Sequence, residues 1–182
     1  MYTGGPLDRA GDRRRGDAAV AELLSHPKAR VAPVWRDRNL VEPGDTPRAG
    51  WLTGEAAVTV TMHASVQVFL GLWEDAPYFA VDLSHHEEHA LPDLVNGATF
   101  EDLRQVGRLL AADEATILAY ARGMTHWHRR QKYCSDCGSP TEARDSGHVQ
   151  ACTNADCGRS HFPRTDPAVI MLVTHVGADG VD

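Results

Sequence analysis

The sequence Cys134-Ser135-Asp136-Cys137 and, after fourteen intervening residues, the sequence Cys152-Thr153-Asn154-Ala155-Asp156-Cys157 decide the fold of this part of the chain. These pairs contain all four cysteines of the 182 residues. Two short cysteine pairs at this separation are typical of a zinc ribbon, in which four thiolates bind one ion. A glycine follows each pair, at Gly138 and Gly158, where a tight turn often needs a positive φ.

The ribbon interpretation predicts a structural zinc site, because four thiolates complete a tetrahedron and leave no open position for chemistry. The residues between the two pairs have the composition of a short hairpin, with Ser146-Gly147 as its turn. Two alternatives are open: a redox pair or two disulfides, and a site in which His148 or His161 replaces one cysteine. The sequence shows no secretion signal, and clustered cysteines then favour metal over disulfide.

The composition is that of a soluble globular protein, with 42% apolar and 24% charged residues. No apolar run reaches the roughly 18 residues that a membrane span needs, so we expect a cytoplasmic protein without a membrane partner. The net charge is −7, which does not favour a phosphate polymer as partner. Residues 131–165 carry four basic and four acidic side chains. This segment therefore has no net charge, which argues against a ribbon that binds nucleic acid.

The N-terminal part of the chain reads as an arm followed by a helix and several strands. Residues 1–17 are rich in glycine, arginine and aspartate, and we expect a disordered arm there. A short helix is predicted over 18–25. Strands are expected over 31–41 with a turn at 36–39, and over 57–60, 66–72 and 78–83. In 66–72 an apolar residue occupies every second position from Val66 to Leu72, which is typical of a half-buried strand.

Two helices are predicted next. Thr99 is expected to cap the first helix, with Asp102 at its third position, and Leu103, Val106 and Leu110 form its apolar stripe. The second helix begins near Asp113. Its apolar residues recur at spacings of three and four, which places them on one helix face; they are Ile117, Tyr120, Met124 and Trp127.

The run Ala168-Val169-Ile170-Met171-Leu172-Val173 is continuously apolar and rich in β-branched residues. Such a run predicts a strand that is buried on both faces of a sheet. A buried strand needs neighbours, and the sequence after it offers none before Asp182. We therefore expect the chain to stop within a domain.

The residues around the cysteines resemble those of a known family. The motif Lys132-Tyr133-Cys134-x2-Cys137-Gly138 and the later motif Phe162-Pro163-Arg164-Thr165-Asp166-Pro167 look like the zinc-ribbon segment of the NAD diphosphatases of the Nudix superfamily. The resemblance is close over about residues 100–175 and loose over the whole chain. It implies an α+β protein with a β-rich N-terminal domain carrying two helices, a four-cysteine zinc ribbon, and the first strand of an incomplete Nudix α/β/α domain. The implied domains are 18–130, 131–165 and 166–182.

The resemblance also implies an activity. The family hydrolyses the pyrophosphate of NAD(H) to nicotinamide mononucleotide and AMP, and in bacteria it can remove NAD caps from RNA. Its members are homodimers, and glutamates of the Nudix box, Gly-x5-Glu-x7-Arg-Glu-x2-Glu-Glu-x-Gly, hold Mg²⁺ or Mn²⁺. No such box occurs in the 182 residues. We therefore name no catalytic residue, and we expect this chain alone to be inactive.

Two substrate contacts follow from the resemblance. Arg104, in Leu103-Arg104-Gln105-Val106, matches a family arginine that contacts substrate, and a guanidinium can pair with a pyrophosphate through two hydrogen bonds. Phe162 matches a family aromatic residue that stacks on a base. Each has a structural alternative: Arg104 can be a solvated helix residue, and Phe162 can be a core residue under the ribbon.

Other functional interpretations remain open. The chain could be a zinc-ribbon module that binds nucleic acid or protein without catalysis, or a remnant that only forms dimers. The cluster His85, His86 and His89, with its neighbouring glutamates, suggests a metal site, but a solvated loop is the better interpretation because the sequence offers no matching ligand cluster.

Overall fold

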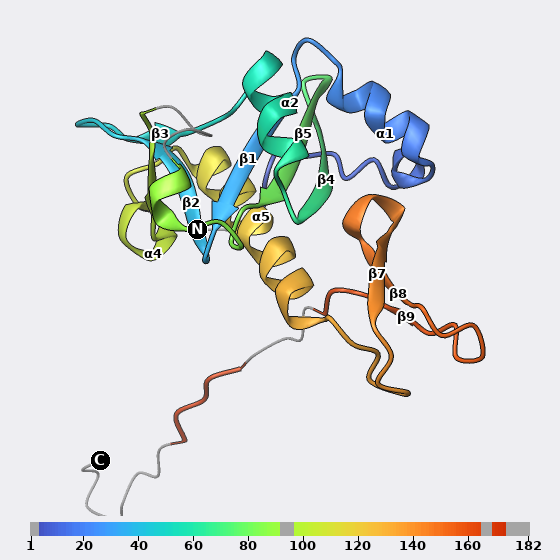
Figure 1. Cartoon of the computed structure of the whole chain (residues 1–182). Coiled ribbons are helices and arrows are strands. Elements are labelled where there is room, and N and C mark those ends of the chain that lie inside the picture. Colours follow the sequence, from blue (N-terminus) through green and yellow to red (C-terminus); the bar gives the residue numbers. More distant parts are fainter. Residues whose placement is uncertain (1–3, 92–96, 165–168, 174–182) are drawn as a thin grey trace, which may run out of the picture.

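The computed structural model describes residues 4–91, 97–164 and 169–173. Its elements alternate between helices and short strands over the first 130 residues, and a small all-β unit follows (Figure 1). The helical elements are η1 (Gly11–Arg14), α1 (Asp17–Leu24), α2 (Gly54–Met62), η2 (Glu88–Ala90), α4 (Leu103–Val106), α5 (Ala112–Arg130) and η3 (Asp145–Gly147). The strands are β1 (Arg30–Trp35), β2 (Arg38–Glu42), β3 (Arg48–Ala49), β4 (Val66–Trp73), β5 (Ala76–Asp82), β6 (Thr99–Glu101), β7 (Thr141–Arg144), β8 (Val149–Cys152) and β9 (Ser160–His161). The α+β class is confirmed.

The N-terminal sheet has the strand order β3-β2-β1-β5-β4, and β6 pairs with β2 off this path. Strands β1 and β5 run parallel, whereas β1–β2, β2–β3, β2–β6 and β4–β5 are antiparallel. The turn between β1 and β2 places Arg36 and Asp37 at φ values of 47° and 65°. Two successive left-handed residues match the right-handed twist of a tight hairpin, so the expected turn at 36–39 is confirmed.

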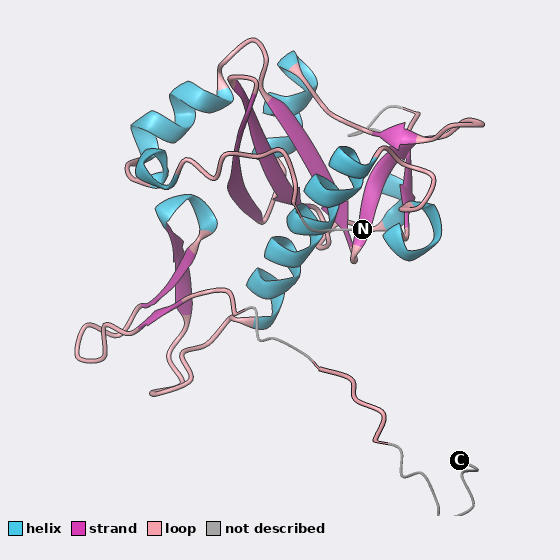
Figure 2. Cartoon of the chain, turned by 180° about the vertical axis from the view of Figure 1, so that it is seen from behind, coloured by secondary structure: helices cyan, strands magenta, loops and turns pink. Residues whose placement is uncertain are grey.

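Helices cover both faces of this sheet, which gives three layers. Helix α5 crosses one face and runs toward the small unit, as the view from behind shows (Figure 2). Helices α1 and α2 lie on the opposite face. The alternation in β4 distributes its side chains between the two cores: Val68 and Leu70 face α5, and Phe69 faces α2. Strand β4 is therefore buried on both faces, where the alternation predicted a half-buried strand.

The prediction of a strand over 57–60 was wrong, because these residues belong to helix α2. The segment buries Ala57 and Val60 against the sheet and leaves Val58 48% exposed. A spacing of three between buried residues is that of a helix. The β-branched residues Val58, Thr59 and Val60 weaken a helix only slightly, and burial of one face outweighs that preference.

The expected helix cap at Thr99 was also wrong. Thr99 lies in strand β6, and Asp102 is the residue that caps α4. The Asp102 carboxylate accepts a hydrogen bond of 3.0 Å from the backbone N–H of Arg104. The second predicted helix is confirmed as α5, with Ile117 and Met124 buried on its inner face. The short helix predicted over 18–25 is confirmed as α1, whereas α2 is a helix that the sequence patterns did not predict.

The first residues after Gly4 do not behave as the expected disordered arm. Asp8 and Leu72 exchange two backbone hydrogen bonds of 2.9 and 2.8 Å, which attaches the segment to β4. The guanidinium of Arg9 lies 3.6 Å from the ring centroid of Tyr120 on α5, and Ala10 is 7% exposed. Contacts with residues distant in the sequence therefore hold this charged, glycine-rich segment in place, and its composition alone does not reveal them.

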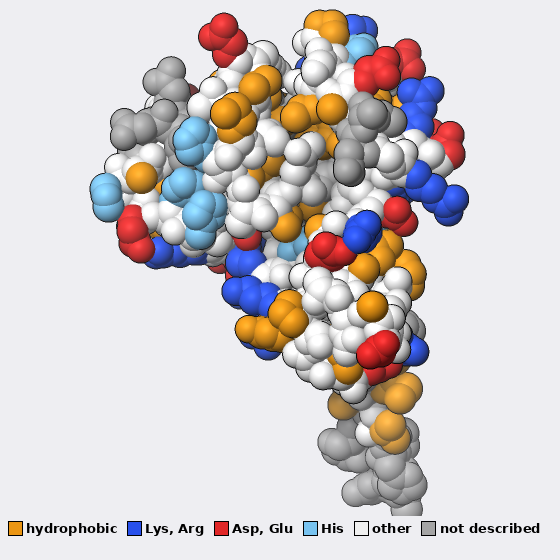
Figure 3. All heavy atoms as spheres, turned by 45° about the vertical axis from the view of Figure 1, so that its right-hand side comes forward, with side chains coloured by type: hydrophobic (Ala, Val, Ile, Leu, Met, Phe, Trp, Pro, Cys, Tyr) orange, Lys and Arg blue, Asp and Glu red, His pale blue; other side chains and the backbone are white. Residues whose placement is uncertain are grey.

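A buried strand was predicted over residues 168–173, and the described residues of this segment do not form one. Residues 169–173 form no strand, and their apolar side chains are 75% to 101% exposed. Exposed hydrophobic side chains lie along this segment below the ribbon in Figure 3. A strand requires a hydrogen-bonded neighbour, and no described segment pairs with these residues. The motif residues 165–168 lie outside the described part.

Candidate functional site

The four cysteines lie on two turns at one end of the small β-unit. Helix α5 ends at Arg130, and the first turn follows, closed by a hydrogen bond of 3.0 Å from the N–H of Gly138 to the carbonyl oxygen of Cys134. In the second turn the N–H groups of Cys157 and Gly158 both donate to Asn154, at 3.0 and 2.9 Å. Gly138 and Gly158 have φ values of 75° and 57°, as the sequence predicted.

The β-strands hold the two turns opposite each other. Strand β7 pairs with β8, and β8 pairs with β9, so that β8 lies in the middle of a three-stranded sheet. Residues 145–147 form the turn between β7 and β8, which confirms the predicted hairpin and its Ser146-Gly147 turn. Cys152 ends β8 and Cys157 precedes β9, so the sheet places the second cysteine pair beside the first.

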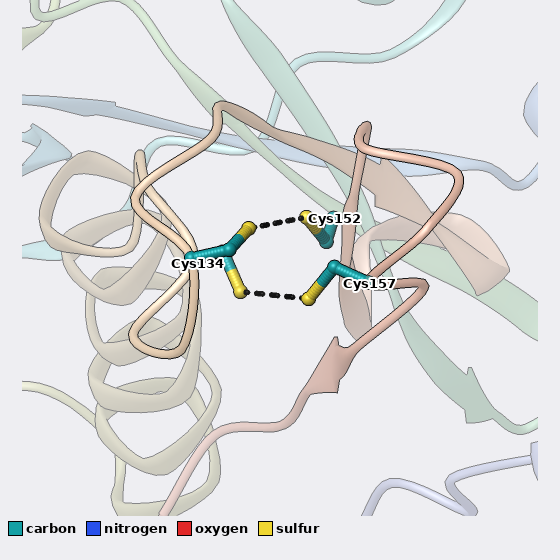
Figure 4. Close-up of side chains that lie close together, drawn as sticks. Cys134, Cys152 and Cys157 are labelled. Carbon is teal, nitrogen blue, oxygen red and sulfur yellow. Dashed lines mark hydrogen bonds between the residues drawn. The ribbon is translucent and has the colours of Figure 1, made fainter.

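The four sulfur atoms form one compact cluster, and all lie within 4.8 Å of one another. The Sγ atoms of Cys134 and Cys157 are 3.7 Å apart (Figure 4). The Sγ atoms of Cys137 and Cys152 are 3.4 Å apart. A disulfide requires about 2.05 Å, so these contacts are not disulfides. Four sulfurs at about 2.3 Å from one ion lie about 3.8 Å apart in a tetrahedron, and the cluster therefore fits a single metal ion.

The surroundings shift the pKa values of two of the thiols in opposite directions. Hydrogen bonds from the side chain and the backbone of Ser139 lower the pKa of Cys137 to about 6, which favours the thiolate that metals bind. Burial raises the pKa of Cys152 to about 12, and the neighbouring sulfurs of Cys137 and Cys134 add to this effect. Thiolates this close repel one another, and a bound cation would remove that repulsion.

The two histidines weighed as alternative ligands have different positions. The Nε2 atom of His161 lies 3.4 Å from the Sγ of Cys134, so His161 borders the cluster beside a cysteine that is already part of it. His148 points away, because its Nε2 donates a hydrogen bond of 2.7 Å to the carbonyl oxygen of Phe69 on β4. The four cysteines form the group of potential metal ligands that the described residues bring together.

The same small unit is attached firmly to the N-terminal sheet. Gly147 packs directly on β4, where an added Cβ would lie 2.8 Å from Cγ2 of Val68. The Nε2 of His128 donates to the Gly147 carbonyl oxygen at 2.7 Å, and its Nδ1 accepts from Gln150 at 2.6 Å. Burial lowers the pKa of His128, which keeps the imidazole in the neutral form that this pair of bonds requires. Sequence patterns gave no sign of this junction.

A network of charged side chains lies at the C-terminal end of α5, close to the ribbon. The guanidinium of Arg129 donates to the carboxylate of Asp82 at 3.1 Å and also bonds to Asp37. Asp82 is 2% exposed, and Ser84 also donates to it. Burial alone would raise the pKa of Asp37, but the charge of Arg129 and the hydrogen bond from His126 outweigh it and lower that pKa. The network fixes α5 against β5 and the β1–β2 turn.

Arg104 and Phe162, the two residues expected to contact substrate, do not line the same groove. Arg104 is exposed on α4 and lines an open groove of about 520 Å³ with Arg122 and His126 of α5. Phe162 follows β9, is 60% exposed, and does not line that groove. An exposed ring favours the substrate contact over the alternative of a core residue under the ribbon. The role of both residues stays a prediction.

Two further expectations concern histidines and membranes. His85 and His89 are exposed, and the cluster around them does not form a metal-ligand group in the described part of the chain. Among the helices of that part, none combines the length and apolar character needed to cross a membrane.

Comparison with known proteins identifies relatives for most of the chain. The family model for an NADH pyrophosphatase-like rudimentary NUDIX domain matches residues 28–127. Nudix hydrolase 19, chloroplastic, from Arabidopsis thaliana is 31% identical over 169 residues, which covers 81% of this chain and 38% of that protein. The NAD-capped RNA hydrolase NudC from Mycobacterium bovis (strain BCG / Pasteur 1173P2) is 31% identical over 172 residues, or 94% of this chain and 51% of the relative.

A third relative matches a shorter part. The NAD-capped RNA hydrolase NUDT12 from Homo sapiens is 38% identical over 72 residues, which covers 36% of this chain and 16% of that protein. The chain thus spans at most about half the length of these three curated relatives.

Proposed function

The chain belongs to the family of NADH pyrophosphatase-like rudimentary NUDIX domains, and from this premise we propose that it supplies the N-terminal domain and zinc ribbon of an NAD(H) diphosphatase. Such an enzyme hydrolyses the pyrophosphate bond of NAD(H) to nicotinamide mononucleotide and AMP, and can act on NAD-capped RNA. The match over residues 28–127 is the observation that carries the proposal. The four-cysteine cluster immediately after that match supports it.

We assign zinc to the cysteine cluster. Four thiolates in a closed tetrahedral arrangement are the typical ligand set of structural Zn²⁺. The ion would hold the two turns together and leave no coordination position for substrate. Its contribution is therefore to the fold of residues 131–165, and the N-terminal domain over 18–130 packs on that unit through Gly147 and His128.

Arg104 and Phe162 are the proposed substrate contacts. The Arg104 side chain is exposed in a groove that also contains Arg122, and an exposed guanidinium suits a phosphate oxygen. Phe162 presents a largely exposed ring, which suits stacking on a base. Phe162 does not line the groove that contains Arg104. A homodimer, in which the two copies complete each other's sites, accommodates both contacts.

The catalytic divalent ion, Mg²⁺ or Mn²⁺, would polarise the phosphate and activate water. The glutamates that hold it in this superfamily belong to the Nudix box, and that box does not occur in these 182 residues. In the proposed reaction, the residues of this chain bind and orient the dinucleotide. We also propose a cytoplasmic location.

The proposal is tested by measuring AMP release from NAD in the presence of Mg²⁺. The assay compares the purified 182-residue chain with the product of the complete encoding gene. We expect hydrolysis only from a product that contains a Nudix box. A complete product with that box but without activity on NAD(H) or NAD-capped RNA would contradict the assignment, and AMP release by the 182 residues would contradict the inactivity of this chain.

A second candidate function is a non-catalytic module that binds a partner or forms dimers; a closed four-cysteine site, which serves the fold and not a reaction, is compatible with it. If the gene ends at codon 182 and the chain dimerises without binding NAD, this second function replaces the first.

A further inference from the structure

An aromatic cavity lies where β1 and β5 begin in the N-terminal sheet, and no cysteine lines it. It has a volume of about 720 Å³, and none of the four cysteines, Arg104 or Phe162 lines it. Its walls come from the start of β1, from β3, from the β4–β5 hairpin and from the first turn of α5. The proposed diphosphatase chemistry does not use this cavity.

Three aromatic side chains form its apolar part. The rings of Trp51 and Tyr78 meet edge to face, with centroids 5.2 Å apart, and Trp73 lies 6.0 Å from Tyr78 at an angle of 33°. Tyr78 is 3% exposed, whereas both indoles are only partly buried. The two tryptophans therefore offer ring surface to a ligand while the tyrosine supports them from beneath.

The position of Trp51 is fixed by several contacts. Its indole Nε1 donates to the carboxylate of Glu114 at 3.3 Å, and the backbone N–H of Ala49 donates to the same carboxylate at 3.2 Å. The backbone at Gly50 packs so closely that an added Cβ would lie 2.8 Å from Cγ of Leu40. A ring held in this way loses little conformational entropy when a planar ligand stacks on it.

The rim of the cavity carries charges of both signs. Lys28, Arg30 and Arg48 line it. The Arg30 guanidinium lies 5.8 Å from the Tyr78 ring centroid, and no carboxylate in the described residues lies within 4.0 Å of these three cations.

The carboxylates of the lining reduce this positive charge. Glu42 and Glu74 also line the cavity, and the carboxylate of Glu114 already accepts two hydrogen bonds. Hydrogen bonds from the neutral donors Trp51 and Ala49 leave the charge of Glu114 in place, so three carboxylates balance the three cations and the lining has no net charge. This balance suits a ligand with a planar ring and a small negative charge better than a dense polyanion.

We propose that this cavity binds a nucleotide, with the base stacked on the indoles of Trp51 and Trp73 and the phosphate at Arg30 and Arg48. The choice of a nucleotide over other planar anions rests on the proposed function, whose substrates consist of nucleotides. Two kinds of ligand present such a base and phosphate: a free mononucleotide, and a nucleotide of an RNA chain that continues beyond the cap.

The test measures equilibrium binding to the 182-residue chain by tryptophan fluorescence and calorimetry. The probes are AMP and an uncapped twelve-nucleotide adenylate RNA. The variants are Trp73→Leu, which removes the stacking ring, Trp73→Phe, which keeps an aromatic ring, and Arg48→Gln. Arg130→Gln is the charge-matched control, because Arg130 is exposed at the end of α5 and does not line the cavity.

We expect Trp73→Leu to weaken binding by about 5- to 150-fold, the ratio that corresponds to one stacked base. Arg48→Gln weakens binding as well, while Trp73→Phe and Arg130→Gln bind nearly as the parent does. Equal affinity for AMP and RNA identifies a free nucleotide as ligand, and tighter, salt-sensitive binding of RNA identifies the chain.

The proposal is wrong if the parent protein binds neither probe, or if Trp73→Leu and Arg48→Gln both bind as the parent does. Neither probe contains the pyrophosphate of NAD, so a negative result here leaves the AMP-release assay unaffected. Conversely, failure of that assay does not alter the measured effect of Trp73→Leu.

Discussion

The Nε2 atom of His148 donates a hydrogen bond of 2.7 Å to the backbone carbonyl oxygen of Phe69. Phe69 lies in the middle of β4 and is fully buried, and His148 lies between the ribbon turn and β8. The bond therefore joins the small β-unit that carries the four cysteines to the centre of the N-terminal sheet. Burial lowers the pKa of His148 to about 4, so the imidazole is neutral at physiological pH.

This junction makes stability depend on pH. The ordinary histidine pKa of 6.5 applies to the unfolded chain, which takes up a proton below that value, whereas native His148 does so only near pH 4. The unfolded state binds more protons in this window, so stability falls as the pH falls from 6.5 to 4, by about 3 kcal/mol at full extent. Urea unfolding of the parent and of His148→Gln across this range measures the effect.

The glutamine variant keeps a donor for Phe69 but does not titrate, so its stability should fall less steeply with acid. His85→Gln, at an exposed position, is the control and should keep the parent's slope. An unchanged slope in His148→Gln would show that protonation of this residue does not weaken the fold.

Replacement of Gly147 by alanine should destabilise the protein by about 2–4 kcal/mol, because the new Cβ overlaps β4 and the backbone holds a strained left-handed conformation. Gly147 has φ 84°, and the added atom would lie 2.8 Å from Val68. Chemical denaturation measures the change. Gly123→Ala is the matched control: it lies within α5 and its Cβ would meet nothing within 4 Å, so it should stabilise by up to about 1 kcal/mol. Equal effects of the two substitutions would refute the close approach at Gly147.

The cysteine cluster should bind one zinc ion per chain. Cys137→Ser should abolish stoichiometric zinc and unfold residues 131–164, because structural zinc contributes directly to the folding free energy of such units. Elemental analysis and protease digestion measure both effects, and Ser135→Ala is the control on the same turn. A chain that contains no zinc as purified, or that keeps a protease-resistant ribbon without it, would remove the basis for the metal assignment.

Loss of Arg129 should be costly because it leaves the buried carboxylate of Asp82 without its cation. Arg129→Met should destabilise the protein by about 3–5 kcal/mol, the usual result of breaking a buried ion pair. The double variant Arg129→Met/Asp82→Asn removes both charges and should recover part of the loss. Thermal or urea unfolding of the single and double variants provides the comparison. If the double variant is no more stable than Arg129→Met, an unpaired charge is not the cause.

Several elements were predictable because their signals are local. The alternation over 66–72, the helical spacing from Ile117 to Trp127 and the turn at 36–39 all correspond to observed elements. The error at 57–60 arose because four residues cannot distinguish alternation from a helix face, and only the burial of Ala57 and Val60 decided it. Residues 8–14 are held in place by contacts with Leu72, Tyr120 and Ser146, which lie far away in the sequence.

The amino-acid sequence by itself determined the two cysteine pairs, their glycine turns and the family motifs around them, because such turns are built from a few adjacent residues. The tertiary structure decided how that unit attaches to the rest of the protein, through His148 and Phe69, His128 and Gln150, and the contact of Gly147 with Val68. It also decided that Trp51, Trp73 and Tyr78 meet in one cavity. The physical reason is that these contacts form only when segments distant in the chain pack together, and no local pattern records which partner a buried side chain will find.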